Sequence, residues 1–308
     1  QEARKTRETV REAVKTVIED IRKERKIDLE KINEAVDSMV ENVTKSPDAL
    51  IWLTRLKNRD SYAYDHGIDV SIYMLSFGRH LGYSRTDMHV LGMAGLLLDI
   101  GKLRMPMELL EKRSRLSPAE FEFMKSHVTE SLAIVKDTAN VPPQVTLIVA
   151  QHHERMDGSG YPGSLTGNGI SLFGAMAAIV DCFEAITSDR PYATAISTHQ
   201  ALQNLNGWKA KLFHEGLVEQ FMQCVGVFPV GSLVELTTGD VGIVIAQNKI
   251  RRLRPKIMVV LDASKRPQQF PVMLDLMNDP IAPDGSIYAI KKDLPVGMYG
   301  IDAREYYL

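Results

Sequence analysis

Cysteine is scarce in this sequence, because only Cys182 and Cys224 occur among 308 residues. Two cysteines, one of them inside an apolar run, argue against a disulfide framework and favour a reducing cytoplasm. The sequence also lacks an apolar run long enough to span a bilayer, and it lacks a signal-peptide pattern. Net charge of one sign is nearly absent, since 37 basic residues oppose 39 acidic ones. This balance excludes a global field that would attract a nucleic-acid polymer or an anionic membrane.

The length and the hydrophobic content are those of an ordinary globular protein. A chain of 308 residues with 44% hydrophobic content can bury a full core, and we predict one main domain with smaller attachments. The chain begins at Gln1 rather than Met. That start is compatible with a fragment that lacks an N-terminal sensory or membrane part.

The N-terminal region, residues 1–47, alternates charged and apolar positions at helical spacing. We predict two amphipathic helices with a break near residues 25–28. Two interpretations remain open for them. They form either a helical cap on the next domain or a coiled coil that dimerises the chain and transmits a signal.

The main region, residues 48–224, has a helical pattern almost throughout. Gly, Pro, Ser and Asp punctuate the joins, and Ser117 with Glu120 marks one helix start as a capping box. The predicted helices cover residues 48–57, 61–81, 86–99, 106–111, 117–136, 142–153, 171–187 and 196–212.

The C-terminal region, residues 225–308, is predicted to be a small β-rich attachment. Residues 232–236 and 241–245 flank a turn sequence and predict a hairpin, and residues 256–261 predict a third strand. Three arginines lie between these strands, and we interpret them as a solvated turn rather than a phosphate site: Arg251, Arg252 and Arg254.

The segment 151–192 carries most of the candidate chemistry. His152 and His153 follow an apolar helical run, a glycine-rich loop ends that helix, and the next apolar helix carries Asp181 and Glu184 on one face. A carboxylate inside an apolar helix is costly unless a partner compensates its charge.

Three further residues are ordinary when each is taken alone. Asp99 has a simple partner in Lys102 three residues later, and His66 and His127 resemble common helix histidines. Their conjunction with the segment 151–192 favours a metal site, because helical bundles build such sites from His and Asp on several helices. The other histidines lack such company and are predicted to be surface or core residues: His80, His89, His199 and His214.

The order of these motifs resembles the HD-GYP family, a branch of the HD-domain metal-dependent phosphohydrolases. The motifs are His66, Asp-Ile-Gly-Lys at 99–102, His127, HHERMDGSGYP at 152–162 and DCFEAITSDRPY at 181–192. The resemblance covers residues 50–220. It implies an all-α HD-domain helical bundle around a bi- or trinuclear metal centre, and hydrolysis of cyclic di-GMP to pGpG or GMP.

The resemblance also implies roles for single residues. Asp99 would bridge two divalent ions of Fe, Mn, Ni or Zn and, with Lys102 beside the scissile phosphate, would be catalytic. Arg190, Lys102 and Tyr161 would bind the substrate, and the loop Gly160-Tyr161-Pro162 would shape the site and contact diguanylate cyclase domains. The implied metal ligands are His66, Asp99, His127, His152, His153 and Asp181.

The sequence departs from the family pattern at three positions. Leu98 stands where the family has the His of its His-Asp pair, so one ion is expected to bind weakly. Tyr62 replaces a Glu of the trinuclear members, so a third ion is not expected. Ala193 stands where many members carry a basic residue that contacts phosphate.

Two classes of function therefore remain open. The first is a cyclic di-GMP phosphodiesterase, active or impaired. The second is a receptor or interaction module without catalysis. A hydrolase for another phosphorylated nucleotide is a weaker third interpretation, and metal content with turnover discriminates among the classes.

Overall fold

The computed structural model describes most of the chain, and two compact units are distinguished in it. The first unit contains residues 1–194 and 205–221, and the second contains residues 195–204 and 222–308. The predicted boundaries at residues 47 and 224 remain predictions. The described residues are 2–23, 25–45, 50–51, 54, 62–190, 193–248, 250–251, 253–295, 297–301 and 306.

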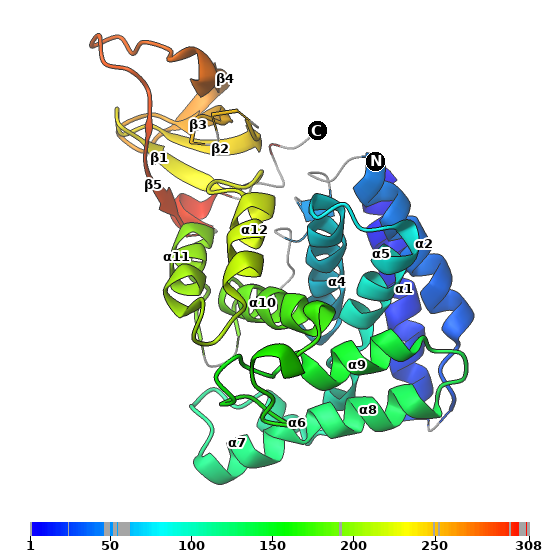
Figure 1. Ribbon diagram of the computed structural model, residues 1–308. Coiled ribbons are helices and arrows are strands. Elements are labelled where there is room, and N and C mark those ends of the chain that lie inside the picture. The colour runs from blue at the N-terminus through cyan, green and yellow to red at the C-terminus, as the bar shows by residue number, and fades with distance from the viewer. Residues whose placement is uncertain are drawn as a thin grey trace. The chain divides into compact units, whose positions relative to one another are not determined.

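The first unit is helical, as the sequence predicted, and Figure 1 shows its helices in chain order. The predicted helix over 48–57 lies mostly outside the described residues. Helix α12 was not among the predicted helices, and the division between the units passes through α11 and α12. The helices are α1 (Glu2–Arg22), α2 (Leu29–Lys45), α4 (Tyr62–His80), α5 (Arg85–Leu97), α6 (Met107–Leu110), α7 (Pro118–Lys125), α8 (His127–Asp137), α9 (Pro143–Gln151), α10 (Leu172–Ile186), α11 (Thr198–Trp208) and α12 (Glu215–Val225).

The helix predicted over 117–136 is two helices, so that prediction was wrong. The predicted capping box of Ser117 and Glu120 does start α7. At the other end of α7, the Ser126 hydroxyl donates to the Phe123 carbonyl at 2.7 Å, and His127 Nδ1 lies 2.6 Å from the Met124 carbonyl. A continuous helix would use these carbonyls for amides four residues later, so the two side chains help to end α7. The break places His127 at the start of α8.

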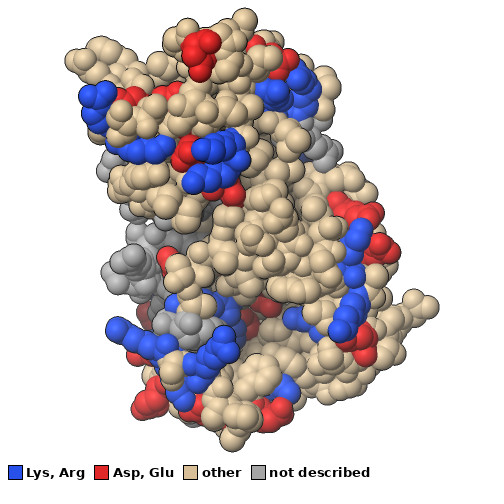
Figure 2. All heavy atoms as spheres, turned by 90° about the vertical axis from the view of Figure 1, so that its left-hand side faces the viewer, with Lys and Arg blue, Asp and Glu red and all other residues tan. Residues whose placement is uncertain are grey.

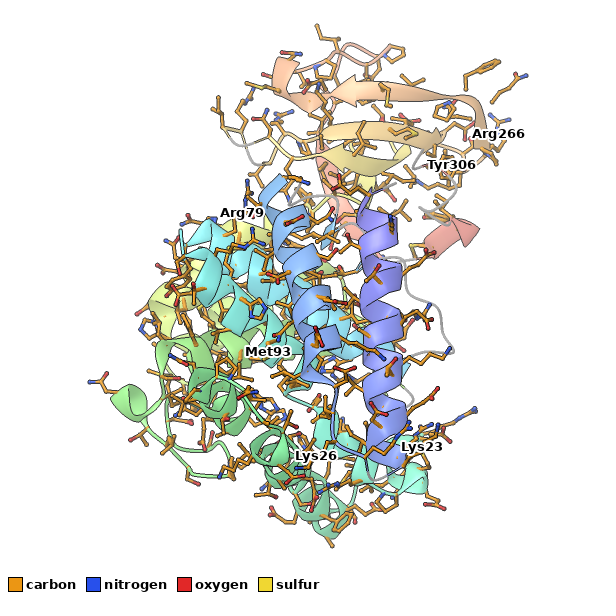
Figure 3. The ribbon with its side chains drawn as sticks, turned by 90° about the vertical axis from the view of Figure 1, so that its right-hand side faces the viewer. Lys23, Lys26, Arg79, Met93, Arg266 and Tyr306 are labelled. Carbon is orange, nitrogen blue, oxygen red and sulfur yellow. The ribbon has the colours of Figure 1, made fainter. Side chains whose placement is uncertain are left out.

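The two N-terminal helices pack on the rest of the first unit as a cap. Figure 3 shows α1 and α2 side by side, with Lys23 and Lys26 near their connection. Both helices contact α4, and α2 also contacts α5. Their apolar stripes are therefore buried within the unit, and a dimer would have to use other faces. The stripe residues include Val10, Val17, Ile18, Ile32, Val36, Met39 and Val43.

An aromatic cluster fills the core behind α4. Phe77 and Phe183 each pack edge to face on Phe221, with ring centroids 5.2 Å apart, and Tyr73 packs on Phe183 at 5.3 Å. Such pairs stabilise a core beyond the area they bury. The cluster joins α4 to α10, and both helices carry candidate ligands.

The second unit contains a five-stranded antiparallel sheet in the order β4-β3-β2-β1-β5. The three predicted strands are confirmed, whereas β4 and β5 were missed. Arg251 and Arg254 both pair with Asp279, as expected for a structural turn rather than a phosphate site, and Arg252 lies outside the described residues. The strands are β1 (Leu233–Leu236), β2 (Val241–Ala246), β3 (Lys256–Leu261), β4 (Pro267–Asp275) and β5 (Ile290–Leu294).

Surface charge is mixed in sign. On the face shown in Figure 2, Lys and Arg are interspersed with Asp and Glu. Among the helices of the described ranges, none combines the length and the apolar character that a membrane crossing needs.

Ion pairs tie α1 to α4 directly beside His66. Arg7 lies 3.0 Å from the fully buried Asp69 and 3.4 Å from Asp65, and its side chain is only 13% exposed. Arg11 also reaches Asp65, at 3.5 Å, but its side chain is 38% exposed. Burial makes the Arg7 pair the costlier one to break.

We expect Arg7→Ala to destabilise the protein by about 3 kcal/mol, because it removes a cation from two buried carboxylates. Arg11→Ala is the matched control and should cost about 0.5 kcal/mol, as exposed pairs do. Urea denaturation followed by circular dichroism measures both. Equal losses for the two variants would contradict the structural role of Arg7.

Candidate metal centre

Five elements of the first unit bring the six predicted ligands together. His66 lies in α4, His127 begins α8, Asp181 lies in α10, and His152 and His153 directly follow α9. Asp99 lies between α5 and the 3-10 helix η1 (Ile100–Arg104). Their donor atoms form two groups, each within 4.8 Å: Asp99, His127, His152 and His153, and His66, Asp99 and Asp181.

Asp99 belongs to both groups. Its Oδ2 lies 2.9 Å from His66 Nε2, while its Oδ1 lies 3.1 Å from His127 Nε2 and 3.7 Å from His152 Nε2. One carboxylate therefore faces two sets of imidazoles. This is the geometry expected of a carboxylate that bridges two ions.

Close packing of η1 on α8 holds Asp99 in this position. A Cβ at Gly101 would lie 2.1 Å from the His127 carbonyl oxygen, so only glycine fits. The Gly101 amide also donates to the Ser131 hydroxyl at 2.8 Å. The glycine two residues after Asp99 thus allows His127 to come within reach of that carboxylate.

His66 is held by a carboxylate that the resemblance did not include. Its Nδ1 is hydrogen-bonded to Glu184, whose other oxygen accepts from the Ser188 hydroxyl at 2.5 Å. Burial lowers the pKa of His66, but the charge of Glu184 and bonds to its three carboxylate neighbours raise it well above its usual value. His66 Nε2 faces Asp99 and Asp181, where a metal ion would replace its proton.

The other histidines are oriented through their backbone contacts. Nδ1 of His127 and of His152 lie 2.6 Å and 2.8 Å from the carbonyls of Met124 and Val149, so each Nε2 faces the cluster. Burial, reinforced by the charge of His152, holds the pKa of His153 well below its usual value. A neutral imidazole is the form that binds metal.

The charge state of Asp99 also suits a ligand. Burial alone would raise the pKa of Asp99, but the Lys102 ammonium and the nearby imidazoles of His127, His152 and His66 hold it well below its usual range. Lys102 Nζ donates to Asp99 Oδ2 at 2.5 Å. The ion pair between Asp99 and Lys102 that the sequence predicted is therefore present, and it forms part of the cluster.

The residues present fit a metal ion. Among the described residues, Asp99 Oδ1 and His152 Nε2 are buried atoms that form no hydrogen bond. Buried polar atoms are usually satisfied, and those left over mark an ion or a water. Because the donors are imidazoles and carboxylates, the set suits Mn, Fe, Ni or Zn.

The glycine-rich loop after His153 is anchored by Glu154, a residue that sequence reasoning did not single out. Its buried carboxylate accepts from the amides of Gly163 at 2.6 Å and Leu165 at 2.9 Å. A Cβ at Gly160 would lie 2.5 Å from Glu154 Cα, so the loop folds tightly over this residue. Its position directly after the two histidines was a signal that could have revealed it.

The predicted substrate-binding residues differ in position. Tyr161 stacks on His153 with ring centroids 4.7 Å apart, and Lys102 touches Asp99, so both lie at the cluster. Arg190 lies beyond the end of α10 in a backbone bridge with Ala193. Leu98 is fully buried at the end of α5, and the side chain of Tyr62 lies outside the described residues.

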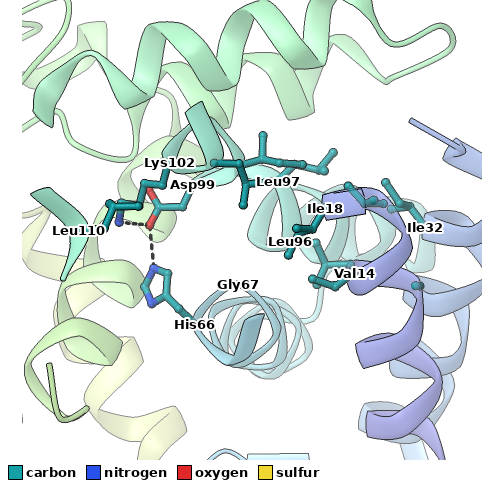
Figure 4. A pocket seen from close by; sticks show the side chains of 14 residues that line it. Val14, Ile18, Ile32, His66, Gly67, Leu96, Leu97, Asp99, Lys102 and Leu110 are labelled. Atoms are coloured by element: carbon teal, nitrogen blue, oxygen red, sulfur yellow. Dashed lines mark hydrogen bonds and ion pairs between the residues drawn. The ribbon is translucent and has the colours of Figure 1, made fainter. Parts of the chain in front are cut away.

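A cavity of about 120 Å³ extends from the cluster towards α1. In Figure 4, His66 and Lys102 both point at Asp99, while Val14, Ile18 and Ile32 line the far part. The cavity is therefore polar at the cluster and apolar below the N-terminal cap.

We expect Glu184→Gln to weaken metal binding by about 10- to 100-fold, because an outer carboxylate orients its histidine and raises its basicity. Ser188→Ala keeps the carboxylate and should have a smaller effect. Competition with a chromogenic chelator measures both affinities. An unchanged affinity in Glu184→Gln would show that His66 does not depend on this carboxylate.

Known proteins resemble this chain in sequence. The family model described as HD domain matches residues 32–214. Cyclic di-GMP phosphodiesterase PA4108 of Pseudomonas aeruginosa is 35% identical over 260 residues, which cover 83% of this chain and 63% of the relative. The 3'3'-cGAMP-specific phosphodiesterase 2 of Vibrio cholerae is 31% identical over 155 residues, which cover 50% of this chain and 30% of that relative. The chain thus spans less than two thirds of the length of either relative.

A solved structure supports the same fold. Bd1817, a HDG"Y"P protein from Bdellovibrio bacteriovorus, superimposes with a TM-score of 0.58 at 18% identity, covering 71% of this chain and 70% of that one. At this identity the likeness bears on the fold alone.

Proposed function

Since this chain belongs to the HD domain family, we propose that it is a metal-dependent phosphodiesterase that hydrolyses cyclic di-GMP to pGpG or GMP. The observation that carries the proposal is the shared carboxylate of Asp99, which faces ligand atoms of both groups. The names of the relatives support the reaction class, since they act on cyclic di-GMP or on 3'3'-cGAMP.

Two divalent transition ions are the proposed cofactors, held by the six ligands that the sequence predicted. When bound, they supply positive charge to the anionic phosphodiester and let water attack it near neutral pH. The water oxygen bonds to phosphorus while one sugar oxygen leaves with a proton, and the ring opens.

The chain's own residues have separate tasks in this proposal. Lys102 adds positive charge where negative charge grows during attack. Arg190 offers a planar fork for a phosphate or a guanine edge. Tyr161 stacks on His153 and thereby lies beside the proposed ligands.

Partners and location remain proposals from the sequence. They comprise a diguanylate cyclase domain at the loop Gly160-Tyr161-Pro162, a homodimer through the N-terminal helices, and a cytoplasmic setting. The burial of the stripes of α1 and α2 within the unit favours the cap over the coiled coil.

A receptor without catalysis is the second candidate, and Leu98 is the observation that favours it. Leucine cannot bind metal, and here it is fully buried beside Asp99. Ala193 removes a further expected phosphate contact. The pocket would then bind the nucleotide and the N-terminal helices would transmit the result.

We expect protein purified without chelator to contain close to two transition ions per chain and to cleave cyclic di-GMP. Lys102→Ala should keep the ions and lower kcat about 100-fold, because its charge acts during attack. Elemental analysis and chromatography of the products measure the two properties. Nucleotide binding by metal-free, inactive protein would support the receptor instead.

We expect Leu98→His to raise occupancy of the ion held by His66, Asp99 and Asp181, because it adds an imidazole beside Asp99. Turnover should rise about tenfold or more. Leu97→His is the matched control, since Leu97 is nearly as buried but does not adjoin Asp99 in sequence. Metal content and cleavage should be measured side by side. A variant that gains an ion and still cleaves nothing would favour the receptor.

A further inference from the structure

Helix α7 lies at the surface beside the candidate metal centre. None of its residues is buried, and it exposes two large rings: Phe121 is 47% exposed and Phe123 is 50% exposed. Exposed aromatic side chains next to a ligand site are available to stack on a flat ligand.

A cation links α7 to the glycine-rich loop. Lys125 Nζ lies 5.1 Å from the Phe121 ring centroid and 5.5 Å from the Tyr161 ring centroid. Tyr161 in turn stacks on His153, with an angle of 28° between the planes. Aromatic rings and one ammonium thus form a continuous series that leads outward from a candidate metal ligand.

We propose that Phe121, Lys125 and Tyr161 form the subsite for one base of the substrate, and that Lys125 makes this subsite prefer guanine to adenine. This inference rests on the proposed function, because it places the phosphodiester at the metal centre. The base then lies one ring further out, against Phe121 and Tyr161.

The preference follows from the hydrogen-bonding groups of the two bases. Guanine presents two acceptors, O6 and N7, on one edge, whereas adenine presents N7 beside an amino donor. A lysine ammonium has three donors and no acceptor. Lys125 therefore pairs with the guanine edge and meets a like donor on adenine.

The present partner of Lys125 is easily exchanged. Lys125 Nζ lies 2.5 Å from Glu122, whose side chain is 70% exposed. Pairs this exposed contribute little to stability. A bound base can take the place of Glu122 without breaking any buried contact.

The test uses Lys125→Gln, because a glutamine amide both donates and accepts and therefore suits the adenine edge. The ratio of kcat/KM for cyclic di-GMP to that for cyclic di-AMP should fall about tenfold. Cleavage of bis(p-nitrophenyl) phosphate, which has no purine edge, should be unchanged. Dissociation constants of the two nucleotides on chelator-treated protein give a readout that is independent of turnover.

Phe121→Ala tests the stacking. It should raise KM for both nucleotides about tenfold, the size expected for one lost base stack. Phe123→Ala is the matched control, because residues two apart on a helix do not face the same side.

The outcomes separate the subsite from the reaction. If the wild-type protein neither binds nor cleaves cyclic di-GMP, the proposed function fails and the subsite falls with it. If the wild-type protein cleaves cyclic di-GMP but Lys125→Gln keeps the guanine preference, only the subsite is overturned. The subsite would also be overturned if Lys125→Gln lost cleavage of bis(p-nitrophenyl) phosphate as strongly as cleavage of cyclic di-GMP, since the change would then have damaged the metal centre.

Discussion

The carboxylate of Asp99 is the interaction on which the arrangement of the first unit depends. Its two oxygens face imidazoles from α4, α8 and α9, and Lys102 contacts it from η1. A carboxylate in this setting is costly unless cations compensate its charge. In the protein alone, the Lys102 ammonium compensates that charge, and the carboxylates around His66 raise the pKa of its imidazole well above the usual value.

Much of this could be predicted from the sequence, because helix ends and motif spacing are local signals. The capping box at Ser117 marked the start of α7, and the spacing of the HD-GYP motifs placed six ligands that the structure brings together. The resemblance to that family is confirmed by the family match and the relatives. The roles of the six residues as ligands remain predictions.

The rest depends on contacts between distant residues, which a single sequence does not display. The helix breaks at Ser126 in part because the Ser126 hydroxyl donates to the Phe123 carbonyl. The contact of Glu184 with His66 exists because α4 and α10 pack together. Strand β4 begins with proline and has mostly exposed residues, so it lacks the alternating pattern of a half-buried strand. Strand β4 forms because its backbone pairs antiparallel with β3.

The two groups of predicted ligands differ in composition, and this difference determines the expected effect of Leu98. One group has three imidazoles and one carboxylate, while the other has His66 and two carboxylates. A group of three protein ligands resembles catalytic sites, which keep a position for water or substrate, whereas a fourth ligand closes a structural site. In the proposed enzyme, the histidine missing at Leu98 would therefore weaken the ion held by His66, Asp99 and Asp181 without removing the place where chemistry would occur. A loss of metal affinity caused by Leu98 would therefore be separable, in the proposed enzyme, from a loss of catalysis.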